Sequence, residues 1–254
     1  MVESRRESDQ SKDLHTKLPI RSHLQEIRSR LLKCVIVLGV TTVISFFFAK
    51  YIFYILESVA EGIDLIYIEM TEMISTYFKV SFVCGFALTL PFFVYQLVMF
   101  LRPGISATER KYLNLLLPGV FLSFAAGVVF GYFVLVPPAA RFLITFGSDI
   151  ATPQIRVGNF VSLMVRLLFA IGLCFETPLL IFFLCKLHIV TPEKLSKYRK
   201  FAVLGAFILA AIITPTFDPI NQTIVAVPLI ILYEVGILLA RLARRREKKP
   251  VPIE

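Results

Sequence analysis

The chain has few charged residues for its length. Only 18% of its 254 residues are Asp, Glu, Lys or Arg and 57% are hydrophobic, whereas soluble domains contain about 25% charged residues. The sequence also lacks HExxH, GxSxG and a Gly-rich phosphate loop with Lys, and its three histidines stand apart from one another. These absences argue against a soluble globular protein and against an enzyme, and we expect no cofactor.

Cysteine is scarce and has no paired spacing. The four cysteines all lie within apolar segments, at Cys34, Cys84, Cys174 and Cys185. Disulfide frameworks and zinc sites need closely spaced or paired cysteines. We therefore interpret these four as small buried hydrophobic residues and expect neither a disulfide nor a metal site.

Six apolar segments dominate what is present. They cover residues 31–49, 77–101, 113–137, 161–187, 201–213 and 224–239. The first four approach or exceed the ~20 residues that a helix needs to cross hydrocarbon. The last two, with 13 and 16 residues, are short and either thin the bilayer or form a re-entrant pair. The sequence predicts an all-α polytopic membrane protein with six transmembrane helices.

Positive charge lies almost wholly on one side of these segments. An even number of passes puts both termini on the same side, and 22 of the 27 Lys and Arg residues fall there. The positive-inside rule makes that side cytoplasmic. The net charge of +9 thus reflects topology, and we expect no nucleic-acid partner. We predict a mobile cytoplasmic N-terminus over residues 1–20, a transmembrane domain over 21–240 and a basic cytoplasmic tail over 241–254, in a prokaryotic inner membrane.

Several charged residues lie inside apolar segments, among them Glu176, Lys79, Arg166 and Glu234. Glu176 occupies the middle of residues 161–187, where a carboxylate costs a few kcal/mol unless it faces protein or water. Pro178 loosens the helix beside it. Glu176 is either a polar contact between helices or a functional group, and intramembrane acids are more often functional. We expect Lys79, Arg166 and Glu234 to extend their charged ends to the membrane interfaces.

Two acids stand out on the basic cytoplasmic face. Glu26 precedes the first span, and Glu109 follows the second within TERK. Residue spacing alone favours an ordinary i,i+4 pair of Glu26 with Arg30 and a solvated loop charge at Glu109. The alternative is a receptor for a cationic ligand, because carboxylates bind guanidinium groups through two parallel hydrogen bonds.

Several motifs in order along the chain resemble one family. HLQEIRSRL, LPFFVYQLVMFLRPGISATER, GYFVLVPPAARF, FETP and TPTFDPINQ followed by LYE together resemble the TatC family, the multispanning subunit of the twin-arginine protein translocase. The resemblance runs from about residue 20 to 240 with the same six-span plan. It departs at Met70-Thr71-Glu72, where the family has a proline in T-P-x-E.

The resemblance implies a receptor for twin-arginine signal peptides of folded cargo. It implies transport driven by the proton-motive force, with single-span TatA-like and TatB-like partners, membrane lipid around the chain, and several copies in the complex. Glu26 and Glu109 match the acids that meet the arginine pair, and Glu176 matches a buried acid in a groove for partner helices. The other residues assigned to signal-peptide binding are Arg28, Tyr95, Gln96, Arg102, Pro103, Gly104 and Arg110. Asp218 and Gln222 belong to the C-terminal hairpin.

Three other functions remain open at this point. An ion-coupled secondary transporter would use Glu176 as its proton site, but the sequence shows no second buried acid and no convincing repeat. A purely structural membrane anchor would tolerate alanine at Glu26, Glu109 and Glu176. An intramembrane hydrolase would need a nucleophile–base pair, which the sequence does not show.

Overall fold

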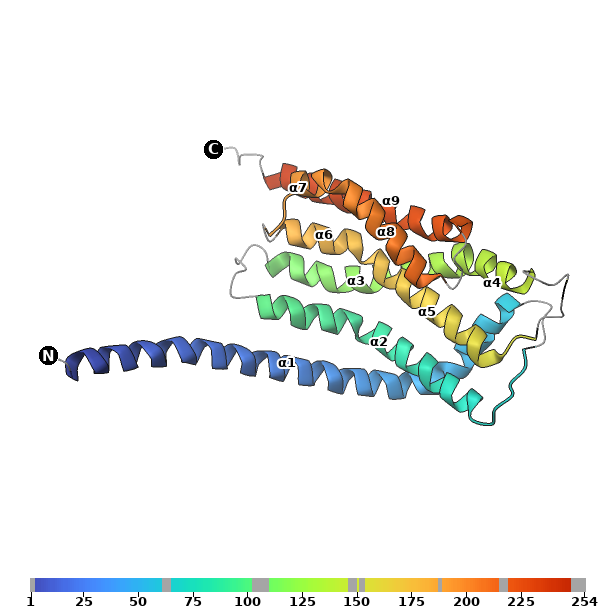
Figure 1. Cartoon of the computed structure of the whole chain (residues 1–254), viewed down its shortest axis with the longest axis horizontal. Helices are drawn as coiled ribbons and strands as arrows, with labels where there is room; N and C mark the ends of the chain where they lie inside the picture. Colours follow the sequence, from blue (N-terminus) through green and yellow to red (C-terminus); the bar gives the residue numbers. More distant parts are fainter. Residues whose placement is uncertain are drawn as a thin grey trace.

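The structure, a computed structural model, describes residues 3–60, 65–101, 110–145, 150, 154–186, 189–214 and 219–247. Its helices follow one another along the chain (Figure 1). They are α1 (Glu3–Glu57), η1 (Ser58–Ala60), α2 (Glu72–Leu101), α3 (Arg110–Phe130), η3 (Gly131–Leu135), α4 (Val136–Thr145), α5 (Val157–Phe175), α6 (Thr177–Lys186), α7 (Pro192–Lys197), α8 (Arg199–Ile213) and α9 (Pro219–Glu247).

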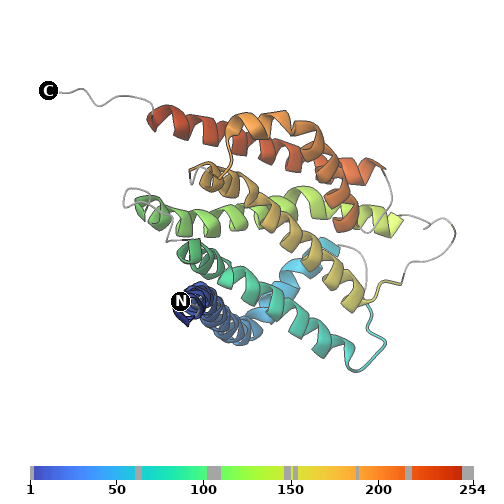
Figure 2. The ribbon, with the colours of Figure 1, turned by 60° about the vertical axis from the view of Figure 1, so that its left-hand side comes forward.

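The helices form a bundle with both termini at one end. α1 lies along one side and α7, α8 and α9 along the other, and a second view shows the same order (Figures 1 and 2). Among the described residues, five helical stretches are long and apolar enough to cross a membrane: Gln25–Glu57, Glu72–Leu97, Leu117–Phe142, Val157–Lys186 and Gln222–Leu242. α8, with 15 residues, supplies the short fifth pass. The predicted fold class is confirmed.

The last pass is longer than its apolar segment. The sequence predicted 16 residues, whereas α9 runs for 29 residues. Pro219 begins this helix because a first-turn residue needs no intrahelical N–H donor. The polar residues at both ends continue the helix beyond the apolar part, so only α8 is short.

α5 is at the centre of the bundle. Phe160, Met164, Leu167 and Ile171 are buried at helical spacing along it, so one face of α5 points into the core. Fully or nearly fully buried side chains of α1, α2, α4, α8 and α9 complete the main hydrophobic cluster. α1 is peripheral, since only 11% of its most apolar window is buried inside the protein. Most of the apolar surface of this window therefore lies on the outside of the bundle.

Prolines interrupt two passes at predictable places. Between α3 and α4 the five residues of η3 form a π-helix, in which Val136 N–H bonds to Gly131 O. Pro137 and Pro138 follow it and have no N–H to donate, so the wider turn accommodates them. Between α5 and α6 the helix breaks at Glu176, two residues before Pro178. This confirms the loosened helix expected there.

α1 begins well before the first apolar segment. The helix is continuous from Glu3 to Glu57. The mobility expected of residues 1–20 stays a prediction, and in the structure residues 3–20 are the first turns of α1. α7 begins at Pro192, directly after Thr191, whose side chain accepts a hydrogen bond from Lys194 N–H.

α1 and α2 cross at Gly85, where their backbones nearly touch. A Cβ at Gly85 would lie 2.6 Å from the Cα of Thr42. The Thr89 hydroxyl donates to the Gly85 carbonyl at 2.7 Å, and the Thr41 hydroxyl lies 2.7 Å from that of Thr89. In lipid, small residues and hydroxyl contacts of this kind hold helices together. This crossing fixes the angle between the two helices that carry the site described next.

Candidate functional site

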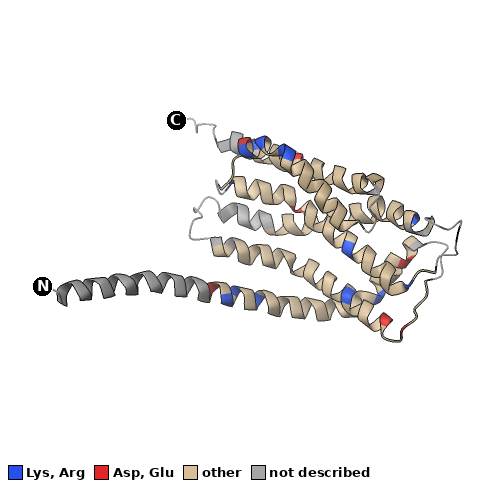
Figure 3. Ribbon diagram, in the orientation of Figure 1, with Lys and Arg blue, Asp and Glu red and all other residues tan. Residues whose placement is uncertain are grey.

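A hollow of about 560 Å³ opens between α1 and α2, at the end of the bundle where the termini lie. Its walls come from one face of α1 and the last turns of α2. They are Gln25, Glu26, Ser29, Arg30, Lys33, Tyr95, Gln96 and Met99. Figure 3 shows that most of the described basic and acidic residues lie toward the two ends of the bundle, with long uncharged stretches of helix between them. The hollow is thus a polar recess at one end of an apolar bundle.

Arg30 binds three different acceptors in this hollow. Its Nε and Nη2 donate to Glu26 Oε1, with Nε at 3.0 Å. Nη1 donates to Gln96 Oε1 at 3.1 Å, and Nη2 also reaches the Met99 carbonyl at 3.2 Å. The pairing with Glu26 is the i,i+4 pair that spacing predicted. The contacts to α2 were not foreseen, and they make the end of α2 a guanidinium-binding surface.

The structure brings some of the predicted signal-peptide residues together. Glu26, Tyr95 and Gln96 line the hollow, whereas Arg28 is exposed on α1 and is not among its lining residues. Arg110 is described only as the first residue of α3. Arg102, Pro103, Gly104 and Glu109 lie outside the described residues. The role of all these residues stays a prediction.

Glu176 is buried at the break between α5 and α6. Only 5% of it is exposed, and its Oε1 has no hydrogen-bond partner among the described residues. The break also frees the Phe175 carbonyl, which accepts a hydrogen bond from the Ser123 hydroxyl at 2.6 Å. An unpaired buried carboxyl oxygen is costly. Glu176 is therefore a polar centre inside the bundle, with one acceptor available for another group.

The remaining predicted polar residues join helices. Gln222 Nε2 donates to the Phe207 carbonyl at 2.8 Å and so ties α9 to α8. Asp218 lies outside the described residues. Glu234 pairs with Arg199 at 2.7 Å, near the end that holds the termini. Tyr233 donates to the Leu195 carbonyl at 2.8 Å, one residue before this ion pair. These contacts fasten the last three helices to one another.

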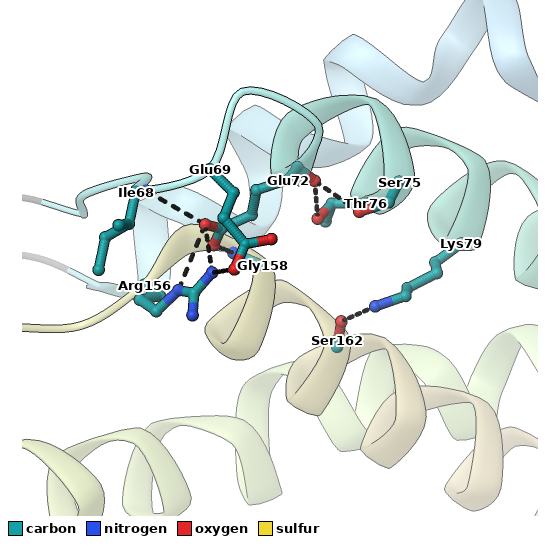
Figure 4. A network of polar contacts seen from close by, with 9 residues as sticks. All are labelled: Ile68, Glu69, Glu72, Ser75, Thr76, Lys79, Arg156, Gly158 and Ser162. Carbon is teal, nitrogen blue, oxygen red and sulfur yellow. Dashed lines mark hydrogen bonds and ion pairs between the residues drawn. The ribbon is translucent and has the colours of Figure 1, made fainter.

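At the opposite end, Glu72 joins the two long connections of the bundle (Figure 4). Its Oε1 accepts from Gly158 N–H at 2.9 Å, and its Oε2 accepts from Arg156 Nη2 at 2.9 Å and from Ile68 N–H at 3.2 Å. A backbone bridge between Ile66 and Arg156 runs alongside. The carboxylates of Glu72 and Glu69 raise the pKa of the Arg156 guanidinium, so Arg156 stays charged. The sequence alone indicated no such role for Glu72.

Comparison with known proteins places these features in a family. The sequence profile described as Sec-independent protein translocase protein (TatC) matches residues 22–228. The chain belongs to the TatC family. The TatC protein of Carboxydothermus hydrogenoformans is 37% identical over 89% of this chain and 93% of its own length. That of Aquifex aeolicus is 36% identical over 91% of this chain and 98% of its own length.

The fold agrees with that of solved TatC. A crystal structure of the twin-arginine translocase receptor TatC superposes with a TM-score of 0.76, at 36% identity, over 88% of this chain and all of that one. As a TatC-family member, the chain is a multi-pass membrane protein and a component of a protein translocase, not a member of a catalytic family. The resemblance noted in the sequence is confirmed, and the secondary-transporter and anchor alternatives lose their support.

Proposed function

We propose that this TatC-family chain is the signal-peptide receptor of a twin-arginine translocase in a prokaryotic inner membrane. It binds twin-arginine signals at the cytoplasmic end of the bundle and assembles, in several copies, with single-span TatA-like and TatB-like partners. Transport is driven by the proton-motive force and needs no cofactor. The membership of the family supports the translocase role, and the hollow between α1 and α2 supports the position of the receptor site.

The observation that carries this proposal is the coordination of Arg30. A carboxylate, an amide oxygen and a backbone carbonyl already surround one guanidinium there. Oxygen acceptors from two helices, fixed by the Gly85 crossing, suit the planar fork of an arginine better than the point charge of a lysine. The same site can therefore distinguish an Arg-Arg pair from Lys-Lys.

A signal arginine can reach Glu26 without first unfolding the site. Both Arg30 contacts to Glu26 are to Oε1, so Arg30 leaves Oε2 available to a second guanidinium. The Glu26 side chain is also 40% exposed. The second arginine needs a second acid, and we propose Glu109 for it. Glu109 belongs to the segment between α2 and α3, which starts just after Leu101, two residues beyond Met99 of the hollow.

Replacing Glu26 by Gln is expected to abolish the preference for arginine. The change keeps the size of the side chain and removes the charge, and a charge-assisted hydrogen bond is worth about 1.5–3 kcal/mol. We therefore expect affinity for a fluorescent twin-arginine signal peptide to fall about tenfold or more, to the level of its Lys-Lys version. Peptide titration of the detergent-purified full chain measures both affinities.

Glu57→Gln is the matched control, because it makes the same change on an exposed residue at the other end of α1. It should leave both affinities as in the unmodified protein. Retention of the arginine preference by a folded Glu26→Gln protein would show that the receptor site lies elsewhere.

We further propose that Glu176 meets a polar group of a partner helix. The family resemblance supports this, and polar contacts between helices in lipid stabilise association by ~0.6 kcal/mol on average. Because Oε1 is itself buried, the partner helix has to reach it through the break between α5 and α6. Glu176→Ala is then expected to lower recovery of the TatB-like partner about threefold in co-purification from membranes. Glu234→Ala, which removes an acid already paired with Arg199, serves as the comparison. Equal recovery from both variants would contradict the contact.

A further inference from the structure

The membrane-spanning helices α2 and α5 each carry one cation near Ser162, Lys79 on α2 and Arg166 on α5. Lys79 and Arg166 are both exposed, and the Lys79 ammonium donates to the Ser162 hydroxyl at 3.4 Å (Figure 4). Ser162 precedes Arg166 by four residues and so shares its helix face. Helical side chains lean toward the N-terminus, which directs Arg166 over the turn that carries Ser162. The geometry thus gathers an ammonium, a guanidinium and a hydroxyl, here named the outer cation pair.

The depth of this pair matches the level of lipid phosphates. The pass Val157–Lys186 has 30 residues and is ~45 Å long at 1.5 Å per residue, as long as a bilayer with its headgroups is thick. Hydrocarbon takes up ~30 Å of that, so it begins ~7 Å from either end. Ser162 lies five residues, ~7.5 Å, from Val157. Ser162 therefore lies at the boundary between headgroups and hydrocarbon, and the long side chain of Arg166, whose Cα is one turn deeper, extends back toward it.

The charge of the pair is not neutralised within the described part of the chain. Neither Lys79 nor Arg166 forms an ion pair with a described carboxylate. By contrast, Arg156, nearer the end of the bundle, contacts both Glu69 and Glu72. Two like charges near one hydroxyl repel each other, and each is costly near hydrocarbon. A single anion between them would relieve both costs.

We propose that Lys79, Arg166 and Ser162 bind the phosphate of an anionic phospholipid in the outer leaflet. Phosphate oxygens accept hydrogen bonds from all three groups, and guanidinium binds phosphate through paired donors. A headgroup of net negative charge suits the site better than phosphatidylcholine, whose own cation would face two others. Phe82, 52% exposed and one turn deeper than Lys79, offers the acyl chains an apolar surface. The site is independent of the signal-peptide function.

Native mass spectrometry of the purified full chain with phosphatidylglycerol and phosphatidylcholine tests this site. The unmodified protein should retain phosphatidylglycerol in preference. Lys79→Gln with Arg166→Gln should lower that retention about tenfold, the effect expected of two lost charge-assisted contacts in a partly wet site. Lys50→Gln with Arg141→Gln removes two exposed cations from the same end and should leave retention nearly unchanged.

Two further arms separate the possible outcomes. Arg166→Lys keeps the charge and should keep most of the phosphatidylglycerol, which a merely misfolded variant would not do. Equal losses in the two double variants would show general attraction to the charged end and overturn the proposal. Thermal stabilisation by inorganic phosphate but not by phosphatidylglycerol would assign the pair to a soluble anion instead, and would overturn it as well.

Discussion

Gly85→Leu is expected to prevent α1 and α2 from packing as they do. A Cβ at residue 85 would lie 2.6 Å from the Cα and 2.7 Å from the backbone N of Thr42, and neither atom belongs to a side chain that could rotate away. Overpacking of cores usually costs 1–3 kcal/mol, and a backbone clash is at the upper end of that range or beyond. With ~3 kcal/mol lost, Tm should fall by about 6–12 °C.

Thermal unfolding of the detergent-purified chain measures this effect, and Gly39→Leu is its control. Gly39 also lies in a spanning helix of this pair, but a Cβ there meets nothing within 4 Å. Leucine at that exposed position should leave Tm unchanged or raise it slightly, since leucine has the better helix propensity. Similar Tm values for the two variants would mean that the close approach of α1 to α2 is not what holds the helices together.

Because the hollow lies between the same helices, Gly85→Leu should also weaken signal-peptide binding.

The passes were predictable because their signals are local. An apolar run of ~20 residues must be helical in lipid, and the missing N–H of Pro178 predicted the break at Glu176 that separates α5 from α6. The length of the last pass was not predictable from hydropathy. Its helix continues from Pro219 into polar residues on both sides of the apolar run.

The site was less predictable, because it depends on contacts between distant residues. Spacing indicated the pair of Glu26 and Arg30, but nothing in the sequence tied Arg30 to Gln96, 66 residues later. That contact follows from the Gly85 crossing, which sets how α1 lies on α2. Glu26, Tyr95 and Gln96 were selected through family resemblance alone, and the structure then placed all three around one hollow.

Glu72→Gln is expected to destabilise the opposite end of the bundle. Each carboxylate oxygen already faces donors, Gly158 N–H at Oε1 and Arg156 with Ile68 N–H at Oε2. An amide in either orientation turns its own NH₂ toward one of these donors, so a buried donor loses its acceptor. Gly158 permits the approach, because a Cβ there would lie 2.8 Å from Glu72 Oε1. We expect Tm to fall by about 5–10 °C.

Glu69→Gln provides a control on the same guanidinium. Glu69 contacts Arg156 at 3.1 Å but its side chain is 66% exposed, against 7% for Glu72. Exposed ion pairs contribute little, so Tm should stay within about 2 °C. If the Glu72 contact acts through Arg156, the fall in Tm of the double variant Glu72→Gln with Arg156→Gln should be well below the sum of the falls in the two single variants. Additive falls in Tm, or equal falls from Glu69→Gln and Glu72→Gln, would show that burial of Glu72 does not organise these connections.

In the family's T-P-x-E segment a proline stands two residues before this acid, whereas this chain has Met70 at that position. The contacts of Glu72 to Ile68, Arg156 and Gly158 tie the start of α2 to the start of α5.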